Sequence, residues 1–152
     1  MRLFLDLDGV FADFESRVIQ ITGAHPKDQK MGQMWKALAR TPDFYATLDW
    51  MPDSQKLWQF CQPHKPTILT GIPMGKWAPG QKRRWVGEQM GWDVPVITCF
   101  AKEKVNHGSP GDILLDDTEK NIVAWQEMGG VGILHTDVQK SIYELEKLLT
   151  KI

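Results

Sequence analysis

The stretch FLDLDGV, residues 4–10, places two aspartates directly after a short apolar segment. Residues Leu3 to Leu7 are apolar apart from Asp6, and Asp8-Gly9 follows, which predicts a buried strand that ends in a turn. Asp6 and Asp8 would then lie at the carboxyl end of this strand. Two carboxylates this close repel each other unless positive charge compensates them, so the stretch is a candidate functional site.

Short apolar segments alternate with helical patterns along the rest of the chain. Further strands are predicted at Thr67–Thr70, Val94–Cys99, Ile113–Leu115 and Val131–Leu134. Helices are predicted at Val10–Ile21, Ser54–Cys61, Gln81–Met90, Glu119–Met128 and Ser141–Ile152. The stretch from His25 to Asp53 shows no strand pattern and predicts a short, mostly helical insertion. The alternation favours an α/β fold, a three-layer Rossmann-like parallel sheet covered by helices on both faces.

Length and composition predict one soluble domain over residues 1–152. The chain has 42% hydrophobic residues and a formal net charge of -1, so no general basic field attracts nucleic acid or a membrane surface. A compact substrate is therefore expected, and no stable nucleic-acid complex. Cys61 and Cys99 match no metal-binding spacing and form no disulfide framework, which favours a reducing cytoplasm. No secretory leader pattern and no stretch of roughly 18 apolar residues occurs.

Polar residues follow the other predicted strands where parallel sheets place their ligand sites. These are Thr70 and Gly71 after the second strand, Lys102 and Lys104 after the third, and Asp116 and Asp117 after the fourth. Each alone has an ordinary explanation as a turn, a helix cap or a surface charge. Together they suit one chemistry, because Mg²⁺ prefers carboxylate and phosphate oxygens and hydroxyl, amide and ammonium groups bind phosphate. The sequence thus predicts a magnesium and phosphate pocket.

The motifs and their order resemble the haloacid dehalogenase superfamily of phosphohydrolases over essentially the whole chain. The resemblance rests on DLDGV at residues 6–10, a strand ending in Thr70, then Lys104, then GDILLDD at residues 111–117. Within the superfamily, DLDGVFADF at residues 6–14 looks like the opening of the small 5'(3')-deoxyribonucleotidases. Lys82 and Lys104 are similarly placed to two lysines of those enzymes.

The resemblance implies a role for each matched residue. Asp6 would be the nucleophile that forms an aspartyl phosphate, and Asp8 the general acid and base. Thr70, Gly71, Lys82 and Lys104 would bind the phosphate. Mg²⁺ would be held by the Asp6 carboxylate, the Asp8 backbone carbonyl and Asp117, while Asp116 would be a ligand or would hold Lys104 in place.

The substrate is less determined than the chemistry. The resemblance implies that the insertion, about residues 15–53, is a small cap. Phe14, just before it, and Trp35, with Phe44 or Tyr45, would sandwich a nucleobase; an ordinary packed helix would show the same spacing. The run Lys82-Arg83-Arg84 fits either a solvated helix face or a phosphate contact by Lys82. Whether Lys102 or Lys104 binds phosphate is open. Gly71 and Thr118 replace a serine and an arginine of the family pattern.

The leading hypothesis is a cytoplasmic, Mg²⁺-dependent nucleoside or deoxyribonucleoside monophosphate phosphatase. The alternatives are a phosphatase acting on nucleic acid termini or on small sugar phosphates. A phospho-acceptor signalling domain of the response-regulator type is a further alternative, but there the acidic pair precedes the acceptor aspartate. Here the adjacent pair, Asp116 and Asp117, comes late in the chain, and this order argues against a signalling domain.

Overall fold

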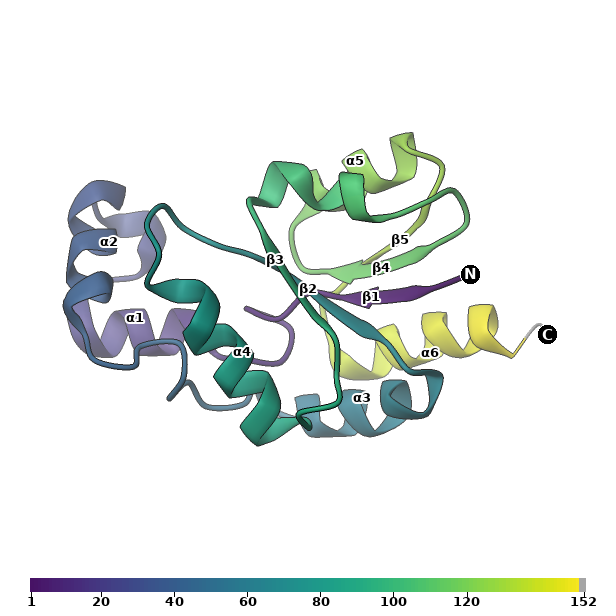
Figure 1. The fold of residues 1–152 in the computed structure, drawn as a ribbon, viewed down its shortest axis with the longest axis horizontal. Helices are drawn as coiled ribbons and strands as arrows, with labels where there is room; N and C mark the ends of the chain where they lie inside the picture. The colour runs from purple at the N-terminus through teal and green to yellow at the C-terminus, as the bar shows by residue number, and fades with distance from the viewer. Residues whose placement is uncertain (151–152) are drawn as a thin grey trace.

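The computed structural model describes residues 1–150, which form a five-stranded parallel sheet between two layers of helices (Figure 1). The strands are β1 Leu3–Leu5, β2 Thr67–Gly71, β3 Val96–Cys99, β4 Ile113–Asp116 and β5 Val131–Leu134. Their order across the sheet is β3-β2-β1-β4-β5, and every neighbouring pair is parallel. The predicted α/β fold with a Rossmann-like sheet is confirmed.

Helices cover both faces of this sheet. The helices are α1 Phe14–Thr22, α2 Met31–Arg40, α3 Ser54–Cys61, α4 Ala78–Gln89, α5 Glu119–Glu127 and α6 Val138–Leu149, with short 3-10 helices η1 Pro26–Asp28, η2 Gln62–His64 and η3 Ala101–His107. Figure 1 shows α3 and α6 on one side of the sheet and α5 on the other. In residues 1–150 no helix combines the length and apolarity needed to cross a membrane.

Alternate residues of each central strand pack on opposite faces, because successive strand side chains point to opposite sides. On β1, Leu3 and Leu5 join the large core that includes α3, α4 and α6, whereas Phe4 joins a smaller core beneath α5. In the smaller core the rings of Phe4 and Trp125 meet edge to face, 5.4 Å apart. Burial on both faces explains why the strands are continuously apolar in sequence.

The connections place a crevice at the carboxyl ends of β1 and β4. From β1 the chain continues to β2 and β3 on one side, and from β4 it continues to β5 on the other. Such a switch in direction is where open α/β sheets bind ligands. The backbone N–H of Asp6 donates to the carbonyl of Leu115 over 2.9 Å, so the residues that follow β1 and β4 are neighbours.

The first predicted helix begins later than the sequence pattern suggested. We predicted it from Val10, but it starts at Phe14, after a tight loop in which the N–H groups of Phe11 and Ala12 both donate to the Leu7 carbonyl. The Asp13 side chain caps this helix by accepting from the Ser16 N–H over 3.2 Å. The apolar residues of the loop are buried in the core, which imitates helical spacing in the sequence.

Other boundaries differ by a few residues. The helix predicted from Gln81 begins at Ala78, since Pro79 fits the first turn of a helix. The helix predicted from Ser141 begins at Val138, after Asp137 has capped it, and its predicted end at Ile152 lies outside the described residues. The segments predicted at 54–61 and 131–134 form as α3 and β5 with the predicted bounds.

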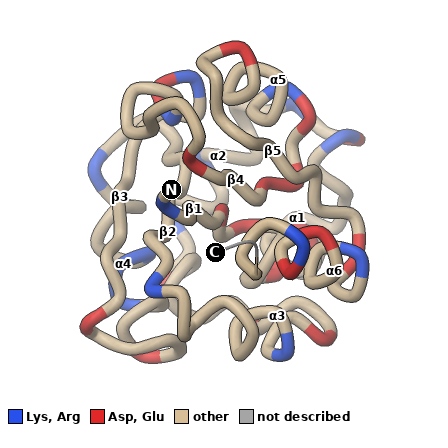
Figure 2. The backbone as a smooth tube through the Cα atoms, turned by 90° about the vertical axis from the view of Figure 1, so that its right-hand side faces the viewer, with Lys and Arg blue, Asp and Glu red and all other residues tan. Residues whose placement is uncertain are grey.

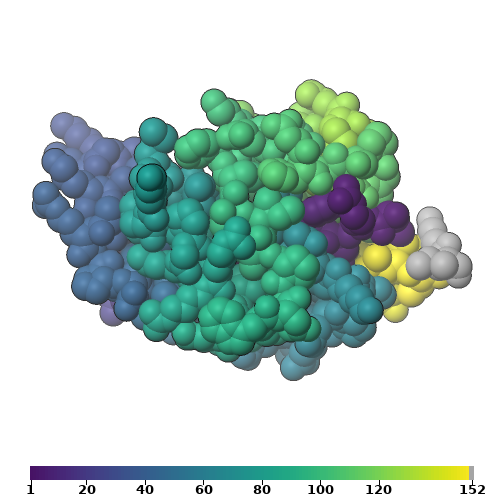
Figure 3. Space-filling view, viewed as in Figure 1, coloured from purple at the N-terminus to yellow at the C-terminus, as the bar shows by residue number. Residues whose placement is uncertain are grey.

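Residues 13–50 leave the sheet and return to almost the same point. Ala12 and Trp50 form an isolated antiparallel bridge, Asp13 N–H donates to the Asp49 carbonyl over 2.8 Å, and Met51 N–H donates to Phe11 over 2.6 Å. The excursion contains α1 and α2, which lie to one side of the sheet in Figure 1. In the space-filling view the α1–α2 region adjoins the region of α4 (Figure 3).

Lys, Arg, Asp and Glu are interspersed over the end of the molecule where the N-terminus lies (Figure 2). This mixture agrees with the formal net charge of -1.

Candidate active site

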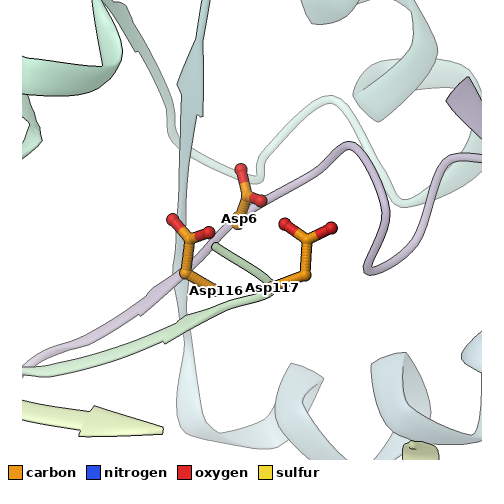
Figure 4. A group of neighbouring side chains, drawn as sticks. All are labelled: Asp6, Asp116 and Asp117. Carbon is orange, nitrogen blue, oxygen red and sulfur yellow. The ribbon is translucent and has the colours of Figure 1, made fainter. Parts of the chain in front are cut away.

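Three of the predicted aspartates meet at the crevice between β1 and β4. Asp6, Asp116 and Asp117 each offer a carboxylate oxygen, and these oxygens lie within 4.8 Å of one another (Figure 4). Lys104, from η3, donates from Nζ to Asp6 Oδ1 over 2.9 Å and to Asp116 Oδ2 over 2.8 Å. Lys104 is buried and Lys102 is exposed, so only Lys104 belongs to this cluster.

Both oxygens of Asp116 have protein partners. Oδ1 accepts from the Thr118 N–H over 2.9 Å, and Oδ2 accepts from Asn121 Nδ2 over 3.1 Å in addition to Lys104. Asp116 is therefore suited to fixing the position of Lys104. Asn121 was not singled out in the sequence, although the first turn of a helix that follows a site strand is a place to search.

The cluster carries more negative than positive charge. Burial, followed by the charge of Asp6, raises the pKa of Asp117 to about 8, and the same two causes raise the pKa of Asp116 to about 6. Burial alone would lower the pKa of Lys104, but Asp6 and Asp116 outweigh it, so the pKa is raised and the ammonium keeps its proton. The cluster thus holds three carboxyl groups and one ammonium, which pairs with Asp6 and Asp116. This oxygen-rich, undercompensated set of donors fits a divalent cation such as Mg²⁺.

Gly9 allows Asp117 to approach the loop after β1. Gly9 has a φ of +81°, and a Cβ at this position would lie 2.0 Å from Asp117 Oδ2. A side chain here would displace that carboxylate, and the backbone conformation itself disfavours any residue except glycine.

Asp8 is held by a second lysine, Lys82 of α4. Lys82 Nζ donates to Asp8 Oδ2 over 2.6 Å, to Thr70 Oγ1 over 2.9 Å and to the Gly71 carbonyl over 2.6 Å. Lys82 is fully buried, so the interpretation as a solvated helix face is wrong for this residue, although Arg83 and Arg84 are exposed. The other Asp8 oxygen, Oδ1, is buried with no partner among the described residues.

A cavity of about 380 Å³ opens over these carboxylates, within the range of about 300–1,000 Å³ of small-molecule sites. Its lining contains both charged or polar residues and apolar residues; the apolar residues are called the apolar wall below. The polar lining includes Asp6, Asp8, Lys104, Asp117 and Asn121, and the apolar lining includes Phe14, Met31, Met34, Trp35, Tyr45, Ile72 and Pro73. Thr70 and Lys82 are not part of this lining; they lie behind it, and their phosphate contacts stay predictions.

The predicted aromatic residues gather at this wall, but not as a sandwich. Phe14 and Trp35 both line the cavity, and their ring centroids are 5.8 Å apart, a direct aromatic contact that leaves no room for a base between them. Phe44 is fully buried, while Tyr45 lines the cavity. Trp77, which sequence reasoning missed, stacks on Tyr45 at 5.3 Å.

The fold is that of haloacid dehalogenase superfamily hydrolases of known structure. The chain is similar to L-2-haloacid dehalogenase from Xanthobacter autotrophicus, at 16% identity and a TM-score of 0.59 over 99% of this chain and 83% of that one. The chain is also similar to a HAD-superfamily hydrolase from Ehrlichia chaffeensis, at 11% identity and a TM-score of 0.60, over 98% of this chain and 97% of that one. A HAD phosphatase from Thermococcus onnurineus matches at 12% identity and a TM-score of 0.52, over 98% of this chain and 97% of that one. No protein-family model and no curated protein matches the sequence.

Gly9→Ala should damage the carboxylate cluster beyond its effect on the backbone. We expect a loss of about 1–2 kcal/mol in the free energy of unfolding from the positive φ, together with loss of divalent-cation binding because Asp117 is displaced. Denaturant unfolding with and without Mg²⁺ measures both effects. Gly23→Ala is the matched control, since Gly23 has a φ of +82° and open space around it. Equal cation binding by both variants would contradict this account of Gly9.

Lys82→Met should separate Asp8 and Thr70 from their shared partner. We expect a loss of about 3 kcal/mol in the free energy of unfolding, because Asp8, whose side chain is only 24% exposed, loses its charge partner and Thr70 and Gly71 lose a hydrogen-bond donor. We also expect a fall of about 100-fold in the turnover of any reaction that uses Asp8 as an acid or base. The measurements are denaturant unfolding and steady-state kinetics.

The control for this prediction is Lys56→Met, because the Lys56 side chain is 72% exposed. The double variant Lys82→Met/Asp8→Asn should be little slower than Asp8→Asn alone if Lys82 acts through Asp8. Fully additive losses would show that Lys82 has a separate role.

Proposed function

We propose that this chain is a Mg²⁺-dependent phosphomonoesterase that hydrolyses nucleoside or deoxyribonucleoside monophosphates through an aspartyl-phosphate intermediate. The observation that carries the proposal is the different environment of the two aspartates after β1. Asp6 is held by Lys104 within the acidic cluster, and Asp8 is held by Lys82 in the same cavity. Such a pair can divide nucleophilic and acid–base roles between its members.

In the proposed first step, an Asp6 carboxylate oxygen attacks phosphorus while the ester P–O bond breaks. Asp8 donates its proton to the leaving oxygen. In the second step Asp8 accepts a proton from water, the water oxygen attacks the same phosphorus, and the bond to Asp6 breaks to release inorganic phosphate. Lys104 Nζ, 2.9 Å from Asp6 Oδ1, is placed to offset charge on the transferring oxygens.

Asp8 favours a phosphatase over a dehalogenase, although both activities occur among solved structures with this fold. A halide leaves as a stable anion, whereas an ester oxygen leaves more readily when it receives a proton. A second carboxyl group in the same cavity, in its protonated form, would supply that proton.

The cation would be held by Asp6, Asp117 and the Asp8 backbone carbonyl. Mg²⁺ supplies positive charge that offsets the carboxylates and the phosphate oxygens. Thr70 and Gly71 are proposed to bind those oxygens. The Thr70 hydroxyl accepts from Lys82 and so keeps its own proton to donate. A contact between Lys82 and phosphate would need one of its three present hydrogen bonds to be replaced.

We further propose that the excursion, about residues 15–53 of a single domain, acts as the cap over the site. It supplies Met31, Met34, Trp35 and Tyr45 to the apolar wall, and Phe14 directly precedes it. An apolar, aromatic wall opposite a phosphate site suits the base of a nucleotide better than a small sugar. A cytoplasmic location is part of the same proposal.

Phosphate release from a panel of esters with Mg²⁺ and with EDTA tests the proposal. We expect dUMP or dTMP to be hydrolysed faster than sugar phosphates or a terminally phosphorylated oligonucleotide, and EDTA to stop the reaction. If only the oligonucleotide were hydrolysed, the nucleotide assignment would be wrong, and the substrates would be nucleic acid termini.

Asp6→Asn should remove hydrolysis and leave the fold intact. We expect turnover to fall about 10³-fold or more, because the amide that replaces the carboxylate is a poor nucleophile. The melting temperature should stay close to that of the unchanged chain, since the amide oxygen can still accept from Lys104. Near-normal turnover with dUMP would refute Asp6 as the nucleophile.

Mg²⁺ should stabilise the folded chain independently of any activity. At one hundred times its dissociation constant, a cation that binds only the folded state adds about 2.7 kcal/mol, a rise in melting temperature of about 5–10 °C for a chain of this size. Thermal unfolding with increasing MgCl₂ measures this shift. Asp117→Asn should abolish it, while Asp93→Asn, on the α4–β3 loop at the opposite end of the sheet, should not. An equal shift in both variants would place the cation elsewhere.

A further inference from the structure

Tyr45 lies in the segment between α2 and α3 and lines the cavity, yet only 2% of the residue is exposed. Its ring stacks against Phe14 with the centroids 6.0 Å apart and against Trp77 at 5.3 Å. Lys82 Nζ lies over the same ring, 4.5 Å from its centroid. The ring is thus covered by protein, and it offers no face on which a nucleobase could stack.

The position of Tyr45 is fixed by α4. The Tyr45 N–H donates to Gln81 Oε1 over 2.7 Å, and the nearby Leu48 carbonyl accepts from Trp85 Nε1 over 2.7 Å. An ion pair of 3.4 Å links Asp43 to Arg84. These partners all belong to α4, so the segment 43–48 is attached to the helix that carries Lys82. This attachment fixes the position of Tyr45 relative to Asp8, which Lys82 also contacts.

The hydroxyl of Tyr45 has no hydrogen-bond partner among residues 1–150. This oxygen is not enclosed, since Asp8 Oδ1 is the buried side-chain atom without a partner among these residues, so the hydroxyl can bind water or a ligand from the cavity. Burial, followed by the negative charge of Asp8, raises the pKa of Tyr45, so this hydroxyl keeps its proton and remains a donor. Because the ring is covered and the residue lines the cavity, the hydroxyl is available to a ligand that occupies the cavity beside Asp8.

We propose that the Tyr45 hydroxyl is a specificity-determining donor that binds a second oxygen of the leaving group, close to the scissile ester. The inference rests on the proposed phosphatase function and adds to it a residue and a substrate feature. Asp8 would protonate the ester oxygen of the leaving group. The ammonium of Lys82 contacts both Asp8 and the Tyr45 ring, so Tyr45 lies beside Asp8. The Tyr45 hydroxyl is therefore assigned to the leaving-group side of the substrate. The preferred substrates are then phosphate esters of sugars or nucleosides, which carry a hydroxyl or ring oxygen near the ester, rather than simple aryl or alkyl phosphates.

Tyr45→Phe tests this inference, because it removes the hydroxyl and keeps the ring that contacts Phe14, Trp77 and Lys82. We expect kcat/KM for dUMP to fall about tenfold, the effect of one lost hydrogen bond in a buried site. We expect kcat/KM for phenyl phosphate, whose leaving group has no second oxygen, to stay within about twofold. The melting temperature should not fall. Tyr143→Phe is the matched control, since Tyr143 is 60% exposed on α6, and it should change neither substrate.

The outcomes separate this inference from the proposed function. If the unchanged chain hydrolyses both esters and Tyr45→Phe lowers both equally, the residue is structural and the inference is overturned. If Tyr45→Phe lowers neither, the hydroxyl does not bind the leaving group, and the inference is again overturned while the phosphatase assignment stands. If the unchanged chain releases phosphate from neither ester, the proposed function fails and the inference falls with it.

Discussion

The buried ammonium of Lys104 is the charge on which the site depends. Parallel pairing of β1 with β4 sets Asp6 beside Asp116, and both carboxylates are almost inaccessible to water. Without a compensating charge, this arrangement would disfavour the fold, since each buried charge loses its hydration. Lys104 bridges the two at 2.9 and 2.8 Å, and Asp117, which it does not contact, is left as the carboxylate with the most strongly raised pKa. The uncompensated remainder of the charge is what makes the cluster suitable for a cation.

The strands, their parallel direction and the polar residues at their carboxyl ends could be predicted, because burial on both faces leaves a continuous apolar signal in each strand, whereas the order β3-β2-β1-β4-β5 was not predicted. The convergence of Asp6, Lys104, Asp116 and Asp117 follows from the parallel direction, since parallel strands end at one edge. The start of α1 could not be predicted, because buried loop residues such as Val10 and Phe11 imitate a helical face. Neither could η3, since a 3-10 helix of seven residues has no clear periodic signature.

Side-chain partners were harder to predict than positions. Lys82 stands in a run with Arg83 and Arg84, and sequence alone does not say which of three basic residues on one helix turns inward. Its burial arises because α4 packs so that Lys82 points toward Asp8, Thr70 and Gly71. The aromatic wall shows the same limit. The resemblance suggested that Phe14 and Trp35 lie at one substrate pocket, but whether their rings hold a base or touch each other depends on three-dimensional packing.

The two aspartates after β1 are separated chemically by having one lysine each. Asp6 is buried and paired with Lys104 from η3, whereas the Asp8 side chain is 24% exposed and paired with Lys82 from α4. α4 packs in the large core and η3 packs in the core beneath α5, so the two lysines reach the carboxylates from opposite faces of the sheet. One lysine ties its aspartate to the acidic cluster, and the other ties its aspartate to the aromatic wall through Tyr45. The bond-forming and leaving-group sides of a substrate would then be set by the two layers that enclose one sheet.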